Sequence, residues 1–486
     1  MTNRPLFQAF CHHVLRYPPE RSRPMSSTKK TIAEGAQSAV ARKLLAYAQG
    51  GDPDVQLPKM LKAVDALVPK DYLVEQRALF HEVIDHPDNN WMVLLKSLWA
   101  DIDPDVLQKA LENFLVNASL IGLRRQDAAA AEHGCNVPWA LLVDPTSACN
   151  LHCTGCWAAE YGDRLNLTFE ELDSIVEQGK ELGVFFYLFS GGEPLVRKRD
   201  VIRLCEKHDD CAFTAFTNAT LIDDALAEDM LRVKNLIPAI SVEGFEEATD
   251  ARRGEGTYAA VVRAMEVLRR HRLPFGVSCC YTHANAASIG SEAFFDDLVA
   301  RGAKFAWFFT YMPVGASAPT DLLATAEDRA FMYRRIRAFR ETKPLFTMDF
   351  WNDGEFTQGC IAGGRRYLHI NANGDIEPCA FIHYSDANIR DTPLLEALKR
   401  PLFMAYHDNQ PFNGNHLRPC PVLDNKDRLA QMVEASGARS TDLEEPEDAA
   451  ALCAKTHAAA DRWEPVAQRL WEEGHWTSGP NAGRRK

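Results

Sequence analysis

Three cysteines, Cys149, Cys153 and Cys156, occur within eight residues, with three residues in the first gap and two in the second. A structural zinc site usually has cysteines in pairs, with a second pair downstream that completes a closed tetrahedron. Here one compact triplet follows an apolar run at 139–143. Three thiolates can bind three irons of a cubic [4Fe–4S] cluster and leave the fourth iron open. The spacing therefore predicts a metal centre with an open coordination position, as in catalytic metal sites.

Two further motifs follow the triplet, and together with it they resemble the radical S-adenosylmethionine (radical SAM) superfamily. Ser190-Gly-Gly-Glu-Pro194 comes directly after an apolar run, where that family has its Gly-Gly-Glu-Pro motif. Ser241-Val-Glu-Gly244 and the segment 250–258 look like the later cofactor contacts of the family. The similarity covers roughly residues 138 to 345.

One position departs from the family pattern. The residue before the third cysteine is commonly aromatic in the family, whereas this chain has Gly155 there and places Trp157 after the cysteine. The difference concerns the packing around the adenine of the cofactor and does not affect the three cysteines.

The resemblance implies a specific chemistry. The open iron would bind the amino and carboxylate groups of S-adenosylmethionine, and the reduced cluster would donate one electron to the sulfonium. Cleavage of the C5′–S bond would then produce a 5′-deoxyadenosyl radical that abstracts hydrogen from a substrate. Cofactors carry this chemistry, and the protein orients and shields them.

The resemblance also assigns cofactor contacts. Glu193 follows two glycines that allow close backbone approach, and it suits the cofactor ammonium. Arg253 offers a fork for the carboxylate, although it could instead be a solvated surface charge, and Arg252 is a rival. Ser241 could instead cap a helix. The complete expected set is Gly191, Gly192, Glu193, Thr217, Asn218, Ser241 and Arg253.

A second cysteine group lies downstream and resembles the start of a SPASM or twitch auxiliary-cluster domain. Asn373-Gly374 is a strong two-residue hairpin turn that would fold Cys360 and Cys379 toward each other. Cys420 is a plausible third ligand. The full SPASM pattern has further closely spaced cysteines that this chain lacks, so we expect one auxiliary [4Fe–4S] cluster. Its fourth ligand could be Cys453, an oxygen or nitrogen atom, or substrate. Packed, reduced cysteines are the alternative.

Cys280 and Tyr311, near the ends of predicted strands, are the catalytic candidates. Cys280 follows Cys279 at the end of the fifth strand, and only one of these two cysteines can face the substrate because side chains alternate along a strand. We expect Cys280 to donate hydrogen or to contact substrate, and Tyr311 to lie near the mouth of the barrel. The alternative for both residues is burial in the core.

Alternating strands and helices occupy the middle of the chain. We predict strands at 140–143, 185–189, 212–217, 237–242, 275–281 and 305–311. Strands that alternate with helices imply a parallel sheet with right-handed crossovers. Six such units are too few to close a barrel of about eight strands, so the predicted fold is α/β, a partial (β/α)6 radical SAM barrel. Ligands bind at the carboxyl ends of such strands, where every motif above falls.

The segments on either side of the predicted barrel differ from it in composition and hydrophobic periodicity. Residues 31–135 have helical periodicity and no chemical motif, which predicts an all-α cap. We predict five parts in all: a disordered tail at 1–30, or one preceding a true start at Met25; the helical domain at 31–135; the barrel at 136–350; a small cluster-binding domain at 351–430; and a helical tail at 431–486.

Composition narrows the class of protein. The net charge of −13 argues against a broad nucleic-acid-binding surface. No apolar stretch approaches the roughly 20 residues that span a bilayer, and the first 24 residues contain no clear signal peptide. The 13 cysteines, without a secretion signal, favour reduced thiols in the cytoplasm. Clusters with an open iron react with oxygen, so we expect an anaerobic or protected setting.

The sequence thus predicts a cytoplasmic radical SAM enzyme with a SPASM- or twitch-like auxiliary cluster. Peptide or protein side chains are the first choice of substrate, and a lipid or small metabolite is the alternative. A small electron donor, a ferredoxin or flavodoxin, is implied because the enzyme needs a source of the electron. The rival from another class is a non-catalytic iron–sulfur or zinc sensor.

Overall fold

The computed structural model describes residues 51–67 and 74–478. The tail predicted at 1–30 lies outside the described residues. The described residues between 51 and 133 are largely helical, as the fold prediction required. The helices are α3 (Pro53–Leu67), α4 (Val74–Asp85), α5 (Asn90–Asp101), α6 (Pro104–Leu111), a π-helix (Glu112–Gly122) and α7 (Leu123–His133).

The central element is a nine-stranded sheet in the order β7-β6-β5-β4-β3-β2-β1-β8-β9. Every neighbouring pair from β7 to β8 is parallel, and β9 is antiparallel to β8. All six predicted strands are present, so the α/β partial barrel is confirmed. The strands are β1 (Ala140–Val143), β2 (Phe186–Phe189), β3 (Ala212–Thr217), β4 (Leu236–Ser241), β5 (Gly276–Tyr281), β6 (Phe305–Thr310), β7 (Phe346–Asp349), β8 (Tyr367–Ile370) and β9 (Ile376–Glu377).

The β8–β9 hairpin extends this sheet, which the sequence did not predict. Its turn has Gly374 at φ +85°, a conformation that glycine adopts easily. β8 pairs in parallel with β1, in the register Ala140 to Tyr367. A local sequence signal predicts a hairpin, but it carries no information about which distant strand the hairpin will join. The C-terminal segment is therefore joined directly to the strand that precedes the first cysteine.

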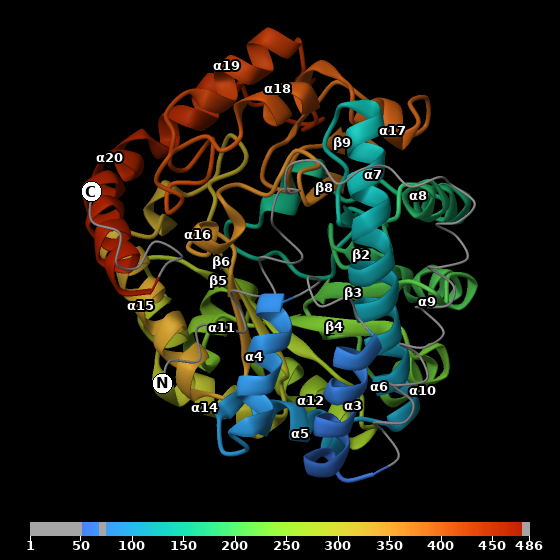
Figure 1. The fold of residues 1–486 in the computed structure, drawn as a ribbon. Helices are drawn as coiled ribbons and strands as arrows, with labels where there is room; N and C mark the ends of the chain where they lie inside the picture. The colour runs from blue at the N-terminus through green and yellow to red at the C-terminus, as the bar shows by residue number, and fades with distance from the viewer. Residues whose placement is uncertain (1–50, 68–73, 479–486) are drawn as a thin grey trace.

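Helices cover the outer face of the sheet. Figure 1 shows α8, α9 and α10 stacked along one side of it. The predicted capping box of α8 is present, because Thr168 accepts from the Glu171 amide and Glu171 accepts from the Thr168 amide. The crossover helices are α8 (Phe169–Glu181), α9 (Lys198–Lys207), α10 (Asp224–Val233), α11 (Glu246–Arg253), α12 (Thr257–Arg270), α14 (Glu292–Arg301) and α15 (Ala326–Thr342).

Part of the N-terminal helical segment lies at the amino ends of the strands. Asn113 donates to the carbonyl of Cys211, directly before β3, and Gln126 donates to the carbonyl of Gly183, before β2. Lys304, directly before β6, donates to Asp101 of α5. These helices therefore cover the end of the barrel opposite to the sequence motifs.

The C-terminal helices are α16 (Gly354–Thr357), α17 (Leu394–Ala397), α18 (Pro401–Asn409), α19 (Arg428–Ser436) and α20 (Ala449–Ser478), and the short strands β10 (Tyr384–Ser385) and β11 (Arg439–Ser440) pair between them. In Figure 1 the C-terminal helices α18 and α19 lie at the top of the view, α17 at the upper right and α20 at the left. Among residues 51–67 and 74–478, no helix combines the length and apolar character that crossing a membrane requires.

Candidate active site

The first cysteine group lies on the loop that follows β1. Cys149 is exposed, and Cys153 and Cys156 are partly buried, so all three thiols face a space that a ligand can reach. Burial is the largest cause that raises the pKa of Cys149 to about 11, and nearby Glu193, Cys156 and Cys153 act in the same direction. A metal ion removes the thiol proton on binding. These soft, clustered and accessible sulfur atoms fit an iron–sulfur cluster.

The glycine motif packs against the chain just before the first cysteine. The amide of Gly192 donates to the carbonyl of Thr146 at 3.0 Å, and the amide of Glu193 donates to that of Ala148 at 2.9 Å. A Cβ atom on Gly191 would lie 2.5 Å from the Thr146 oxygen, and one on Gly192 would lie 2.2 Å from the Ala148 oxygen. Only glycine fits at both positions, because any side chain would separate the two loops.

The Glu193 carboxylate is buried, with 1% of the residue exposed. It accepts hydrogen bonds from the Thr217 hydroxyl at 2.7 Å, the Asn218 amide at 2.7 Å and the Leu195 amide at 3.0 Å. The Asn218 side chain in turn lies 3.9 Å from the sulfur of Cys149. The fold therefore brings Glu193, Thr217 and Asn218 together beside the first cysteine, although β2 and β3 are separated by a helix in the sequence.

A second charged group adjoins the loop at Cys153. Arg253 donates through Nε and Nη2 to one oxygen of Glu243, at 2.8 and 2.5 Å, and Arg252 donates to the same oxygen at 2.6 Å. Arg253 Nη1 lies 3.9 Å from the Cys153 sulfur. Since the Arg253 side chain is only 13% exposed, the alternative that it is a solvated surface charge is wrong.

Glu243 is the member of this group that sequence reasoning missed. It is fully buried, and its second oxygen accepts from the amide of Cys280 at 3.2 Å. Its signals were its place two residues after the end of β4 and its membership of the Ser241-Val-Glu-Gly244 motif, from which only Ser241 was selected. Ser241 is half-buried at that strand end, and Phe245 occupies the position before α11, so the alternative that Ser241 caps a helix is wrong.

The two catalytic candidates lie close to the cysteine loop. Cys279 is fully buried and Cys280 is partly exposed, as the alternation along β5 predicts. Burial raises the pKa of Cys280 to about 11 although Arg252 opposes this, so its thiol is protonated at neutral pH. Tyr311 is 1% exposed. A Cβ atom on Gly155 would lie 2.7 Å from the Tyr311 ring, so an aromatic ring from the end of β6 fills the place of a residue-155 side chain.

The second cysteine group surrounds one cavity. Cys360, Cys379 and Cys420 all line it, together with Phe350, Trp351, Ile361, Ala362, Phe381, Ile382, Tyr406, Pro419 and Pro421. The Tyr367 hydroxyl donates to the Cys379 sulfur at 2.6 Å, and Arg365 donates to the Cys360 carbonyl at 2.7 Å. Cys453, the candidate fourth ligand, does not line this cavity.

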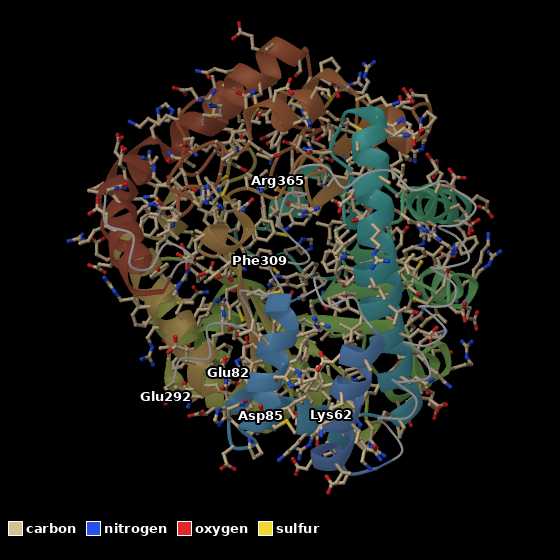
Figure 2. All side chains as sticks on the ribbon, in the orientation of Figure 1. Lys62, Glu82, Asp85, Glu292, Phe309 and Arg365 are labelled. Carbon is tan, nitrogen blue, oxygen red and sulfur yellow. The ribbon has the colours of Figure 1, made fainter. Side chains whose placement is uncertain are left out.

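Aromatic side chains of β6 adjoin the rings that line the second cysteine cavity. On β6, Trp307 and Phe309 are half-buried, whereas Phe308 between them is fully buried, so the first two face the inside of the barrel. Phe309 contacts Phe350 and Phe381, with ring centroids 5.3 and 6.4 Å apart. In Figure 2 Phe309 lies near the middle of the molecule, with Arg365 above it in this view. The inner face of the barrel is thus largely apolar.

A buried charged network links β8 to the end of β1, and the sequence gave no signal for it. His369 lies 2.9 Å from Asp144 and 2.6 Å from Glu377, and all three residues are fully buried. Tyr161 donates to Glu377 at 2.8 Å. Burial lowers the pKa of His369, but Asp144 and Glu377 outweigh it and raise the pKa to about 10. The charged imidazolium therefore joins the chain before Cys149 to the hairpin that carries Cys379.

Comparisons with known proteins agree with these features. Residues 143–284 match the model of the radical SAM superfamily. The AdoMet-dependent heme synthase of Methanosarcina barkeri is 24% identical over 290 residues, which are 54% of this chain and 82% of that protein. The mycofactocin maturase MftC of Mycolicibacterium smegmatis is 28% identical over 265 residues, 51% of this chain and 66% of that protein.

Solved structures support the fold. The crystal structure of Streptococcus suis SuiB bound to S-adenosylmethionine matches with a TM-score of 0.51 at 16% identity, covering 71% of this chain and 85% of that one. The prediction from the cysteine triplet and the later motifs is confirmed for this part of the chain, because residues 143–284 carry a radical SAM superfamily domain.

Proposed function

We propose that Cys149, Cys153 and Cys156 hold the cluster of a radical SAM enzyme that abstracts hydrogen from its substrate. One observation carries this proposal. These thiols lie close to the Glu193 carboxylate at the carboxyl ends of the parallel strands. When bound, the cluster and the cofactor supply one-electron cleavage of the C5′–S bond.

The chain's own residues bind and orient the cofactor in this proposal. Glu193 accepts the cofactor ammonium, and its carboxylate is held in place by the hydroxyl of Thr217 and the amide of Asn218. Arg253, held by Glu243 beside Cys153, places positive charge near the carboxylate of the cofactor. Ser241 at the end of β4 completes the set, with Gly191 and Gly192 bringing the motif loop close to the cysteines.

Cys280 is the residue that we propose to donate hydrogen to the substrate or to contact it. Its protonated, partly exposed thiol lies beside Arg252 and suits hydrogen donation or substrate contact. Replacing Cys280 with Ala should abolish or divert product formation while S-adenosylmethionine is still cleaved, and product mass spectrometry measures both. Unchanged turnover and product would remove Cys280 from the mechanism. Tyr311 serves in this proposal as a wall of the cofactor site against Gly155.

An auxiliary cluster is proposed in the second cavity. Cys360, Cys379 and Cys420 come from three separate segments and line one small space, which suits three thiolate ligands. The hydrogen bond that Tyr367 donates to the Cys379 sulfur further supports this assignment, because hydrogen bonds to the sulfur atoms of a cluster tune its reduction potential.

A peptide or protein side chain is the proposed substrate. The cysteine-type sulfatase-maturating enzyme of Clostridium perfringens, whose name implies action on a protein, is 28% identical over 173 residues, 31% of this chain. A second candidate is an apolar small molecule such as a tetrapyrrole, favoured by the aromatic inner face and by the heme synthase relatives. We propose a cytoplasmic enzyme reduced by a ferredoxin or flavodoxin, since it requires one low-potential electron per turnover.

Anaerobic reconstitution tests the proposal. The protein should bind about eight irons, four per cluster, and release 5′-deoxyadenosine with S-adenosylmethionine and a strong reductant. Mass spectrometry of a peptide pool and of a tetrapyrrole mixture, each with and without reductant, then separates the two substrate classes. A Cys149→Ala protein is the control for background cleavage. Iron-free protein, or no 5′-deoxyadenosine, would refute the enzymatic assignment of these cysteines.

A further inference from the structure

Tyr406 of α18 is buried in the wall of the second cysteine cavity. The residue is 0% exposed, and it lines the cavity together with Cys360, Cys379 and Cys420. Its phenol oxygen has no hydrogen-bond partner among the described residues. Leaving a buried hydroxyl unsatisfied costs about 1–3 kcal/mol, so such a group in a native protein needs an explanation, of which a bound metal or other ligand is one.

The Tyr406 ring is held firmly in this position. A Cβ atom on Gly363 would lie 2.4 Å from the Tyr406 Cβ, so the glycine lets α18 approach the turn that follows Cys360. Phe412 packs against the ring edge-on, with centroids 5.3 Å apart. The hydroxyl therefore cannot easily turn away to find a partner elsewhere.

Tyr367 and Asp424, two oxygen-bearing side chains near the cavity, already have hydrogen-bond partners. The Tyr367 hydroxyl donates to the Cys379 sulfur at 2.6 Å. Asp424 accepts from Arg329 at 2.7 Å with one oxygen and from the Cys420 amide at 3.0 Å with the other. Cys453 lies outside the cavity lining. Among the described residues that line the cavity, Tyr406 carries a side-chain oxygen without a hydrogen-bond partner.

We infer that the phenol oxygen of Tyr406 is the fourth protein ligand of the auxiliary cluster. The inference rests on the proposed function, which places that cluster on the three cysteines. Coordination releases the phenol proton to solvent, as it does for each thiol, and a tyrosinate is a known iron ligand in haem proteins. With all four irons bound by protein, the auxiliary cluster has no position for substrate, and its role is electron transfer or support of the fold.

The test uses full-length protein carrying Cys149→Ala, Cys153→Ala and Cys156→Ala, so that any remaining cluster is the auxiliary one. Reconstituted protein should show iron–phenolate vibrations in resonance Raman spectra, and these should vanish in Tyr406→Phe. Cyanide should shift the electron paramagnetic resonance spectrum of reduced Tyr406→Phe and leave that of unmodified Tyr406 unchanged. Tyr367→Phe is the matched control and should keep the phenolate bands.

Two results separate the possible failures. The protein with Tyr406 could form a four-iron cluster whose spectra lack phenolate bands and shift with cyanide. That result would overturn the assignment of Tyr406 as fourth ligand but not the cluster itself. Absence of iron in the protein without the first three cysteines, or no further loss of iron when Cys360, Cys379 and Cys420 are replaced by alanine, would overturn the auxiliary cluster itself.

Discussion

The two cysteine groups of this protein are built in opposite ways. Cys149, Cys153 and Cys156 lie on one loop, and they are exposed or only partly buried. Cys360, Cys379 and Cys420 span a stretch of sequence that includes a hairpin and α18, and they line one small cavity with aromatic walls, where Cys379 is buried and the other two are partly buried. An open loop leaves room for a cofactor at a bound metal, whereas the proposed Tyr406 ligand would fill the remaining position of the second group. On these proposals, substrate chemistry belongs to the first group.

Separate removal of the two groups gives the largest expected effects. Cys149→Ala, Cys153→Ala and Cys156→Ala together should remove about four irons and abolish 5′-deoxyadenosine formation, because no open iron remains for the cofactor. The corresponding replacements of Cys360, Cys379 and Cys420 should also remove about four irons but leave reductive cleavage measurable. Iron analysis and chromatography of 5′-deoxyadenosine provide both readouts. Equal loss of cleavage in the two proteins would refute the division of labour.

Glu193 should be the most sensitive single position for cofactor binding at the open group. Glu193→Gln removes the charge that faces the ammonium, and a hydrogen bond to a charged group contributes about 1.5–3 kcal/mol. The Kd for S-adenosylmethionine should therefore rise roughly 10- to 100-fold. Equilibrium dialysis measures the change, with Glu181→Gln on the exposed end of α8 as control. An unchanged Kd would exclude Glu193 from the cofactor site.

His369 should make the link between the two regions dependent on pH. Asp144 and Glu377 outweigh burial and raise its folded-state pKa to about 10, above an unfolded value near 6.5. The stabilisation is complete below about pH 6.5 and is lost as the pH rises toward 10.

Anaerobic urea unfolding at pH 7 and pH 10 tests this link. The free energy of unfolding should fall between the two pH values. His369→Gln leaves two buried carboxylates without their cation, and it should lower the stability at pH 7 by about 3–5 kcal/mol and weaken the dependence on pH. The exposed His86 provides the control His86→Gln. Parallel pH profiles of wild type and His369→Gln would show that the imidazole is uncharged.

The smallest effect is expected at the contact between Gly155 and Tyr311. Gly155 has φ +65°, and a Cβ atom there would lie 2.7 Å from the Tyr311 ring. Gly155→Ala should cost about 1–3 kcal/mol of stability through backbone strain and overpacking. In a Tyr311→Ala background the steric part of that cost should disappear, as thermal unfolding of the four proteins of a double-mutant cycle would show. Additive effects would mean that the two residues are not in contact.

Sequence reasoning succeeded wherever the information was local. The triplet, the glycine motif, the six strands and the Asn373-Gly374 turn each depend on neighbours within a few residues. It failed for contacts between distant segments. The sequence did not indicate that Glu243 would pair with two arginines. It also did not indicate that His369 would lie between Asp144 and Glu377. The cavity residue Tyr406 also carried no local pattern.

The sequence by itself determined the reaction class and the type of fold, because ligand spacing, strand alternation and glycine positions are properties of short segments. The tertiary structure alone decided that a C-terminal hairpin joins β1, that Tyr311 fills the space at Gly155, and that Tyr406 faces three cysteines with its phenol oxygen unsatisfied. Those arrangements depend on which surfaces meet when the chain packs. Packing is a sum over many distant contacts, and no single stretch of residues encodes it.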